Sequence, residues 1–182
     1  MKYRLIYVLF FLSLFSGLFW FFRNLITETG NKSSSETIIN SPVPLITPEN
    51  FQKQIVLLVN NERVKDELKP LTENPELDES AKNKATDMFA KNYWAHNSPD
   101  GVTPWAQFAK VGYAYQYAGE NLARNFSSPE GTVLAWMNSP EHKSAILNPE
   151  YTETGVWVGE GKFNNTETLL VVQHFATPYL NK

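Results

Sequence analysis

The sequence predicts an α+β fold for residues 48–182, in which three or four helices stack on a small antiparallel sheet. Two observations carry this prediction. Apolar residues recur at helical spacing in several segments between residues 48 and 148, whereas residues 154–176 are rich in β-branched and aromatic side chains. Helices and strands are therefore partly segregated along the chain, which is typical of α+β proteins.

Each expected helical segment, including two short ones, begins with a small polar residue followed by proline. The polar side chain caps the first turn, and proline suits a position whose N–H has no partner in the helix. These starts are Thr47-Pro48, Asn74-Pro75, Thr103-Pro104, Ser128-Pro129 and Ser139-Pro140. The second helix is expected to end near Trp94, because the "SPDG" that follows contains residues that break helices and form turns.

The strands are expected in two places. Residues 113–123, "YAYQYAGENLA", alternate aromatic and small side chains and are expected to be extended. Residues 154–161 and 166–176 are separated by the turn-like "KFNN" and are predicted to form an antiparallel hairpin.

The N-terminal part of the chain differs in composition from the rest. Leu5–Phe22 carries no charged residue and would span about 27 Å as a helix, which is close to the hydrocarbon thickness of a bilayer. Bulky residues follow Ser16 and Gly17, so no good cleavage site ends the run. Residues 1–22 are therefore predicted to be a signal anchor, with secretion after signal cleavage as the alternative. Residues 23–47, rich in Ser, Thr, Asn and Pro, are predicted to be a flexible linker.

The short N-terminal tail is expected to stay inside the cell. The chain is then a single-pass membrane protein with an extracellular C-terminal domain.

Charge and composition exclude some classes of partner and site. The net charge is −3 and there is no basic run, so nucleic acid is not expected as a partner. The absence of cysteine excludes disulfides and cysteine-based metal or nucleophile sites.

Five motifs, in this order, resemble the CAP superfamily of cysteine-rich secretory, antigen 5 and pathogenesis-related 1 proteins. They are "LLVNNERVKDELKPL", "AKNKATDMFAKNYWAHNSPDG", "AGENLARNF", "VLAWMNSPEHKSAILNPEYTETGVWVG" and "VVQHFA". The absence of cysteine makes the chain most similar to the bacterial SCP-like branch. The resemblance implies a three-layer α-β-α sandwich with the small sheet between helices.

The resemblance also implies a cavity that two histidines and two glutamates line in eukaryotic members, where a divalent metal can bind. His96, Glu120 and His142 match family positions, and Glu141 is a further candidate for the cleft. The fourth family position is assigned to Leu170, which cannot bind metal. His174 shares a strand face with Leu170 but is displaced from it by about 13 Å, so it is interpreted as a half-exposed sheet residue rather than a substitute ligand.

These residues leave the function open between different classes. One hypothesis is a binding module whose cleft takes a lipid, a glycan, a peptide or a partner protein. Another is a metal-dependent hydrolase of peptide or cell-wall material, in which His96, Glu120 and His142 hold zinc. A third is a structural adhesion, spore or envelope component without cleft chemistry. The residues themselves also allow a purely structural interpretation, in which Glu120 bonds to His96 and contacts His142, and the network stabilises the fold. Since one ligand position is apolar, a non-enzymatic binding module is preferred, and no catalytic residue is assigned.

Overall fold

The structure, a computed structural model, describes residues 46–179. The predicted anchor, residues 1–22, and all of the predicted linker except Ile46 and Thr47 lie outside this range. Within it, no helix combines the length and apolar character required to cross a bilayer. The elements are α1 (Pro48–Lys65), β1 (Thr72–Glu73), α2 (Pro75–Lys91), α3 (Trp105–Lys110), β2 (Tyr115–Arg124), α4 (Pro129–Asn138), α5 (Pro140–Ile146), β3 (Glu153–Phe163) and β4 (Thr166–Pro178).

Four of the five helices begin where the small polar residue and proline predict them, whereas α3 begins one residue later, at Trp105, with Pro104 at its N-cap and no side-chain cap. Thr47 Oγ1 accepts from Asn50 N at 3.2 Å, and Asn74 Oδ1 accepts from Glu76 N at 2.8 Å. Ser128 caps α4 in the same way. Ser139 precedes α5 but makes no capping hydrogen bond, because its hydroxyl contacts a histidine instead.

The sheet has four strands in the order β1-β3-β4-β2. The predicted hairpin is confirmed as β3 and β4, and the extended segment is confirmed as β2, which pairs antiparallel with β4. Asn164 and Asn165 form the hairpin turn with φ of 49° and 60°, as a type I′ turn requires. The expected purely antiparallel sheet is wrong in one respect. β1 pairs parallel with β3, and its two residues are too short to show a periodic pattern.

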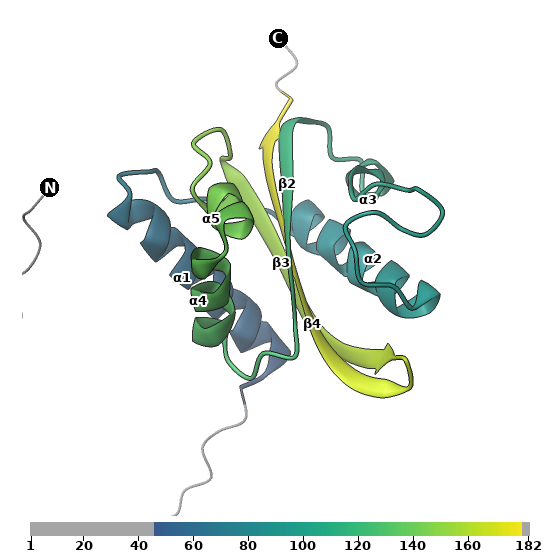
Figure 1. Ribbon diagram of the computed structural model, residues 1–182. Helices are drawn as coiled ribbons and strands as arrows, with labels where there is room; N and C mark the ends of the chain where they lie inside the picture. Colours follow the sequence, from purple (N-terminus) through teal and green to yellow (C-terminus); the bar gives the residue numbers. More distant parts are fainter. Residues whose placement is uncertain (1–45, 180–182) are drawn as a thin grey trace, which may run out of the picture. The chain divides into compact units, whose positions relative to one another are not determined.

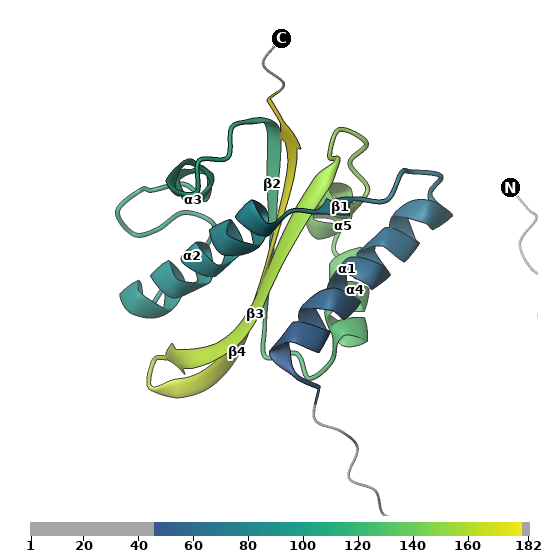
Figure 2. The same cartoon turned by 180° about the vertical axis from the view of Figure 1, so that it is seen from behind.

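Helices cover both faces of the sheet. α1, α4 and α5 lie on one face, and α2 and α3 lie on the other (Figure 1), as the view from behind also shows (Figure 2). Each face has its own apolar core. Residues from α1, α4 and β3 form one cluster, while α2 and α3 pack against side chains of β2 and β4 in two further clusters. The arrangement agrees with the α-β-α layers that the family resemblance implies.

Gly155 allows α2 to lie directly against β3. A Cβ atom at this position would lie 2.2 Å from the backbone nitrogen of Asp78 and 2.2 Å from the carbonyl carbon of Leu77. Asp78 Oδ1 also accepts a hydrogen bond from Val156 N at 2.7 Å, which joins the start of α2 to the same strand. This contact sets the height of α2 above the sheet, and therefore the positions of the side chains that α2 directs toward β4.

We expect Gly155→Ala to destabilise the protein by about 2 kcal/mol or more, because backbone rather than a flexible side chain blocks the added methyl group. The measurement is the free energy of unfolding in urea. Gly131→Ala is the matched control, since its Cβ would meet only side-chain atoms, Ser128 Oγ at 3.2 Å and Phe126 Cδ1 at 3.7 Å, and helix α4 gains propensity. An unchanged unfolding midpoint for Gly155→Ala would show that α2 does not pack this closely.

Candidate functional site

A buried carboxylate on β2 is the centre of the site. The register of β2 and β4 places Glu120 opposite His174. The hydrogen bond from Asn125 N to Leu169 O shows that the odd-numbered residues here make the β2–β4 backbone bonds, so Glu120 and His174 form a non-hydrogen-bonded pair. Side chains lie closest together in such pairs, and His174 Nε2 is 3.1 Å from Glu120 Oε2.

The other carboxylate oxygen binds His96, whose Nδ1 is 2.6 Å from Glu120 Oε1. His96 lies in the loop after α2, where Asn92 ends the helix in the left-handed conformation. The predicted "SPDG" turn is confirmed, because Gly101 N donates to Ser98 O at 2.9 Å and Gly101 has a φ of 77°. The two imidazoles thus reach one carboxylate from a loop and from a strand.

His174 is fully buried, so its interpretation as a half-exposed residue is wrong. Its Nδ1 lies 2.9 Å from Ser80 Oγ on α2, and its ring lies 4.8 Å from that of Phe108. A hydrogen-bonded chain therefore runs from Ser80 through His174 and Glu120 to His96.

The role assigned to position 170 is also corrected. Leu170 is fully buried in an apolar cluster with Ala81, Ala85 and Met88 of α2. It faces Arg124 across the sheet, four residues along the strand from the pair of Glu120 and His174. A ligand at position 170 would lie away from the carboxylate, so Leu170 does not mark the loss of a site residue. Position 174 is the one that the register brings to Glu120.

His142 does not join this cluster. Its Nδ1 lies 2.8 Å from Ser139 Oγ, and the described residues show no hydrogen bond between His142 and Glu120. Asn121 Nδ2 donates to His142 O at 3.2 Å and so ties α5 to β2 beside the site. Glu141 is exposed and makes no side-chain hydrogen bond within residues 46–179. Among the described residues, His142 therefore has no hydrogen bond to the chain of Ser80, His174, Glu120 and His96.

The pKa values follow from this geometry. Burial opposes ionisation of Glu120, but hydrogen bonds from His174 and His96 and the charge of Lys84 outweigh it, and the pKa of Glu120 lies below its usual value. The hydrogen bond to Glu120 raises the pKa of His96. Burial and, to a lesser degree, the charge of His96 lower the pKa of His142.

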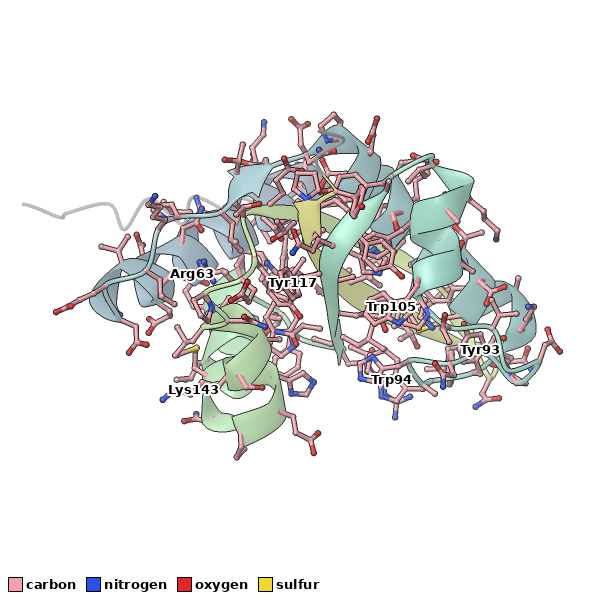
Figure 3. All side chains as sticks on the ribbon, turned by 90° about the horizontal axis from the view of Figure 1, so that it is seen from above. Arg63, Tyr93, Trp94, Trp105, Tyr117 and Lys143 are labelled. Carbon is pink, nitrogen blue, oxygen red and sulfur yellow. The ribbon has the colours of Figure 1, made fainter. Side chains whose placement is uncertain are left out.

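A hollow of about 320 Å³ opens beside His96. Figure 3 shows Trp94 and Trp105 on one side of β2 and Lys143, on α5, on the other. The hollow lies along β2, with Trp105 on one side and Ala145 of α5 on the other. Its lining consists of His96, Asn97, Pro104, Trp105, Ala118, Gly119, Glu120 and Ala145. The side chain of His96 is 57% exposed and that of Glu120 is 1% exposed, so His96 is the member of the pair that reaches the surface.

The predicted zinc set does not fit this arrangement. Both oxygens of Glu120 already accept hydrogen bonds from imidazoles, and His142 is held by Ser139. Among residues 46–179, no group of three or more His, Asp or Glu side chains is placed to hold a metal ion. Glu120 is instead positioned behind His96, where it fixes the orientation of the ring.

The prediction from the sequence missed Lys84, which is 1% exposed. Its Nζ donates to Tyr93 Oη at 3.0 Å, to Ala95 O at 2.9 Å and to His96 O, which uses all three N–H groups of the ammonium. Lys84 therefore fixes the loop that carries His96. A signal was available, because Ser80 and Lys84 lie on the same helix face as Leu77 and Ala81, where an apolar stripe would be expected.

We expect Glu120→Gln to lower the free energy of unfolding by about 3 kcal/mol near pH 5.5, because it leaves the buried His174 and the partly exposed His96 without their anion. The pKa of Glu120 is lowered from 4.5, so the stability that its ionised carboxylate contributes is lost as the pH falls through its pKa in the folded state. The pKa of His96 is raised from 6.5, so the stability that its protonated ring contributes is lost as the pH rises through its pKa in the folded state. Urea unfolding at about pH 5.5 and pH 8.5 should therefore show the larger loss at pH 5.5. An equal loss at both would contradict this pairing.

Comparison with known proteins supports the same family as the motifs. Residues 56–175 match the family described as CAP, the cysteine-rich secretory protein family. The chain is 41% identical over 128 residues to the Bacillus subtilis protein YkwD, which aligns over 48% of its own length. It is 36% identical over 107 residues to the B. subtilis membrane protein YlbC, which aligns over 31% of its length.

A solved structure leads to the same result. An extracellular protein containing an SCP domain from Bacillus anthracis matches with a TM-score of 0.61 and 27% identity, over 71% of this chain and 43% of that one. The chain thus spans less than half the length of each of these three relatives. The family match covers residues 56–175, which are 120 of the 182 residues and more than half of the chain. This protein therefore belongs to the CAP family of cysteine-rich secretory proteins.

Proposed function

We propose that the protein is an exported, membrane-anchored binding module whose ligand enters the hollow beside His96. The observation that carries this proposal is the division of roles in the hydrogen-bonded chain. Glu120 is buried and both its oxygens are engaged, whereas the exposed His96 ring has Nε2 available at the hollow. A ring oriented from behind by a carboxylate is well suited to bind a polar group of a ligand.

The walls of the hollow support a binding role. Pro104, Trp105, Ala118 and Ala145 give it an apolar lining, and few polar groups converge there, which is the usual composition of ligand sites. Its volume of about 320 Å³ suits one small group of a lipid, glycan or protein rather than a whole large ligand.

The membrane anchor rests on the sequence of the first residues and on the relatives. Leu5–Phe22 is free of charge and long enough to cross a bilayer. One relative is named as a membrane protein, and another as extracellular. Both descriptions agree with a domain that is held outside the cell.

The alternative function, a metal-dependent hydrolase, is less well supported. It would use the ring nitrogens of His96 and His142 that face away from Glu120 and Ser139. Among residues 46–179, neither the second oxygen of Glu120 nor a further carboxylate is placed to complete the set.

The binding function is tested by thermal unfolding of the full chain in detergent with panels of peptides, glycans and lipids. A ligand that binds the native state stabilises it, by about 2.7 kcal/mol at a ligand concentration of 100 Kd, and therefore raises Tm. We expect His96→Ala to abolish the shift, while the exposed Lys162→Ala, on the β3–β4 hairpin, retains it. A shift that survives His96→Ala would place the ligand elsewhere. Tight stoichiometric zinc that is lost in both His96→Ala and Glu120→Ala would favour the hydrolase instead.

Protease treatment of intact cells tests the topology. We expect external protease to release or degrade residues 48–182 while a label at the N-terminus stays protected, because Leu5–Phe22 would remain in the bilayer. Permeabilised cells provide the control for protease access. Protection of residues 48–182 in intact cells, together with their cleavage after permeabilisation, would contradict an extracellular domain.

A further inference from the structure

β2 is an edge strand, and its outer side borders the hollow. The strand order places β2 at the end of the sheet, with β4 as its only partner among the described strands. Figure 1 shows β2 at the front, between the layer of α4 and α5 and the layer of α2 and α3. Edge strands carry backbone N–H and C=O groups that no neighbouring strand pairs.

The register shows which residues present these groups outward. Asn125 N donates to Leu169 O at 2.9 Å, so residue 125 faces β4. Because the direction alternates along a strand, residues 119, 121 and 123 also face β4, whereas Ala118, Glu120 and Leu122 direct their N–H and C=O away from it.

Two of these outward carbonyls are already used. Tyr151 Oη donates to Ala118 O at 3.0 Å, and Trp136 Nε1 donates to Leu122 O at 3.1 Å. Both hydrogen bonds independently confirm the outward direction. Glu120 lies between these two residues. No described residue outside the sheet strands donates to its backbone oxygen or accepts from its backbone N–H.

Glu120 therefore keeps an available pair of backbone groups at the hollow. The residue as a whole is 9% exposed while its side chain is 1% exposed, so the exposed part is mainly backbone. Ala118, Gly119 and Glu120 all line the hollow, so the donor and the acceptor lie next to its apolar walls. His96 closes the same space with its free Nε2.

We propose that the hollow binds an extended peptide segment, one residue of which pairs with the backbone of Glu120 as an added strand would. The proposal rests on the proposed binding function and names its ligand class. A residue in an extended peptide directs its N–H and C=O to the same side, which matches the N–H and C=O of Glu120. The single amide of an N-acetylated sugar directs them to opposite sides and can satisfy only one.

The surroundings limit this pairing to a short segment. The hydrogen bonds to Ala118 O and Leu122 O leave one available backbone acceptor among these three residues. Pro104, Trp105 and Ala145 leave room for a small apolar side chain, and His96 Nε2 can bind a polar group of the next residue. The edge is thus closed to long strand addition, which would risk aggregation, while one peptide unit stays accessible.

The test is a titration of the ¹⁵N-labelled full chain in detergent with acetyl-tetra-alanine amide, followed by the NMR signal of the Glu120 amide. We expect this signal to shift with a Kd in the millimolar range. The fully N-methylated peptide, which lacks the donor groups, should bind at least tenfold more weakly, and N-acetylglucosamine should bind no better than the methylated peptide. These controls change the ligand and leave the protein intact.

Equal binding of the methylated and unmethylated peptides, or a Glu120 shift caused only by the sugar, would overturn the proposal. So would the absence of any shift with the peptide. If a lipid or glycan nevertheless raises Tm in a manner that depends on His96, the binding function stands and only the peptide class is wrong. If no ligand of any panel acts through His96, the binding function is wrong as well.

Discussion

The site depends on one buried anion that two histidines share. Taking the carboxylate of Glu120 out of water costs several kcal/mol, and this cost is offset only if both oxygens find strong donors. His174 binds one oxygen from inside the sheet layer, and His96 binds the other from the loop. Three separate segments of the chain must therefore be correctly placed before the ion is stable, which couples the site to the whole fold.

The fold supplies each of these placements by a different contact. The β2–β4 register brings His174 directly opposite Glu120. Close approach of α2 at Gly155 brings Ser80 to the other nitrogen of His174. Lys84, on the next turn of α2, fixes the loop of His96 by donating hydrogen bonds to the backbone oxygens of Ala95 and His96. Burial lowers the pKa of Lys84 below its ordinary value, although the charge of Glu120 counteracts this shift. The ammonium and the carboxylate thus also stabilise each other's charged forms.

Much of the fold could be predicted from the sequence because its signals are local. A polar residue before a proline marks a helix start whatever the tertiary structure, and the Asn164–Asn165 turn is defined by its own backbone. His96 and Glu120 were found through the motifs. His174 was misplaced because strand alternation gives the face of a residue, but only the register gives its partner. The two-residue β1 was missed because nothing in so short a segment repeats.

The family match assigns the fold, but the residues around Glu120 decide what this member can do. With both carboxylate oxygens committed to imidazoles, the site is a charge-stabilised support for His96 rather than an open set of metal ligands. The most direct measurement is a ¹³C NMR titration of the Glu120 side-chain carboxyl. If the two histidines outweigh burial, its pKa lies below the ordinary value of 4.5. A pKa at or above 4.5 would show that burial prevails and would contradict the shared anion.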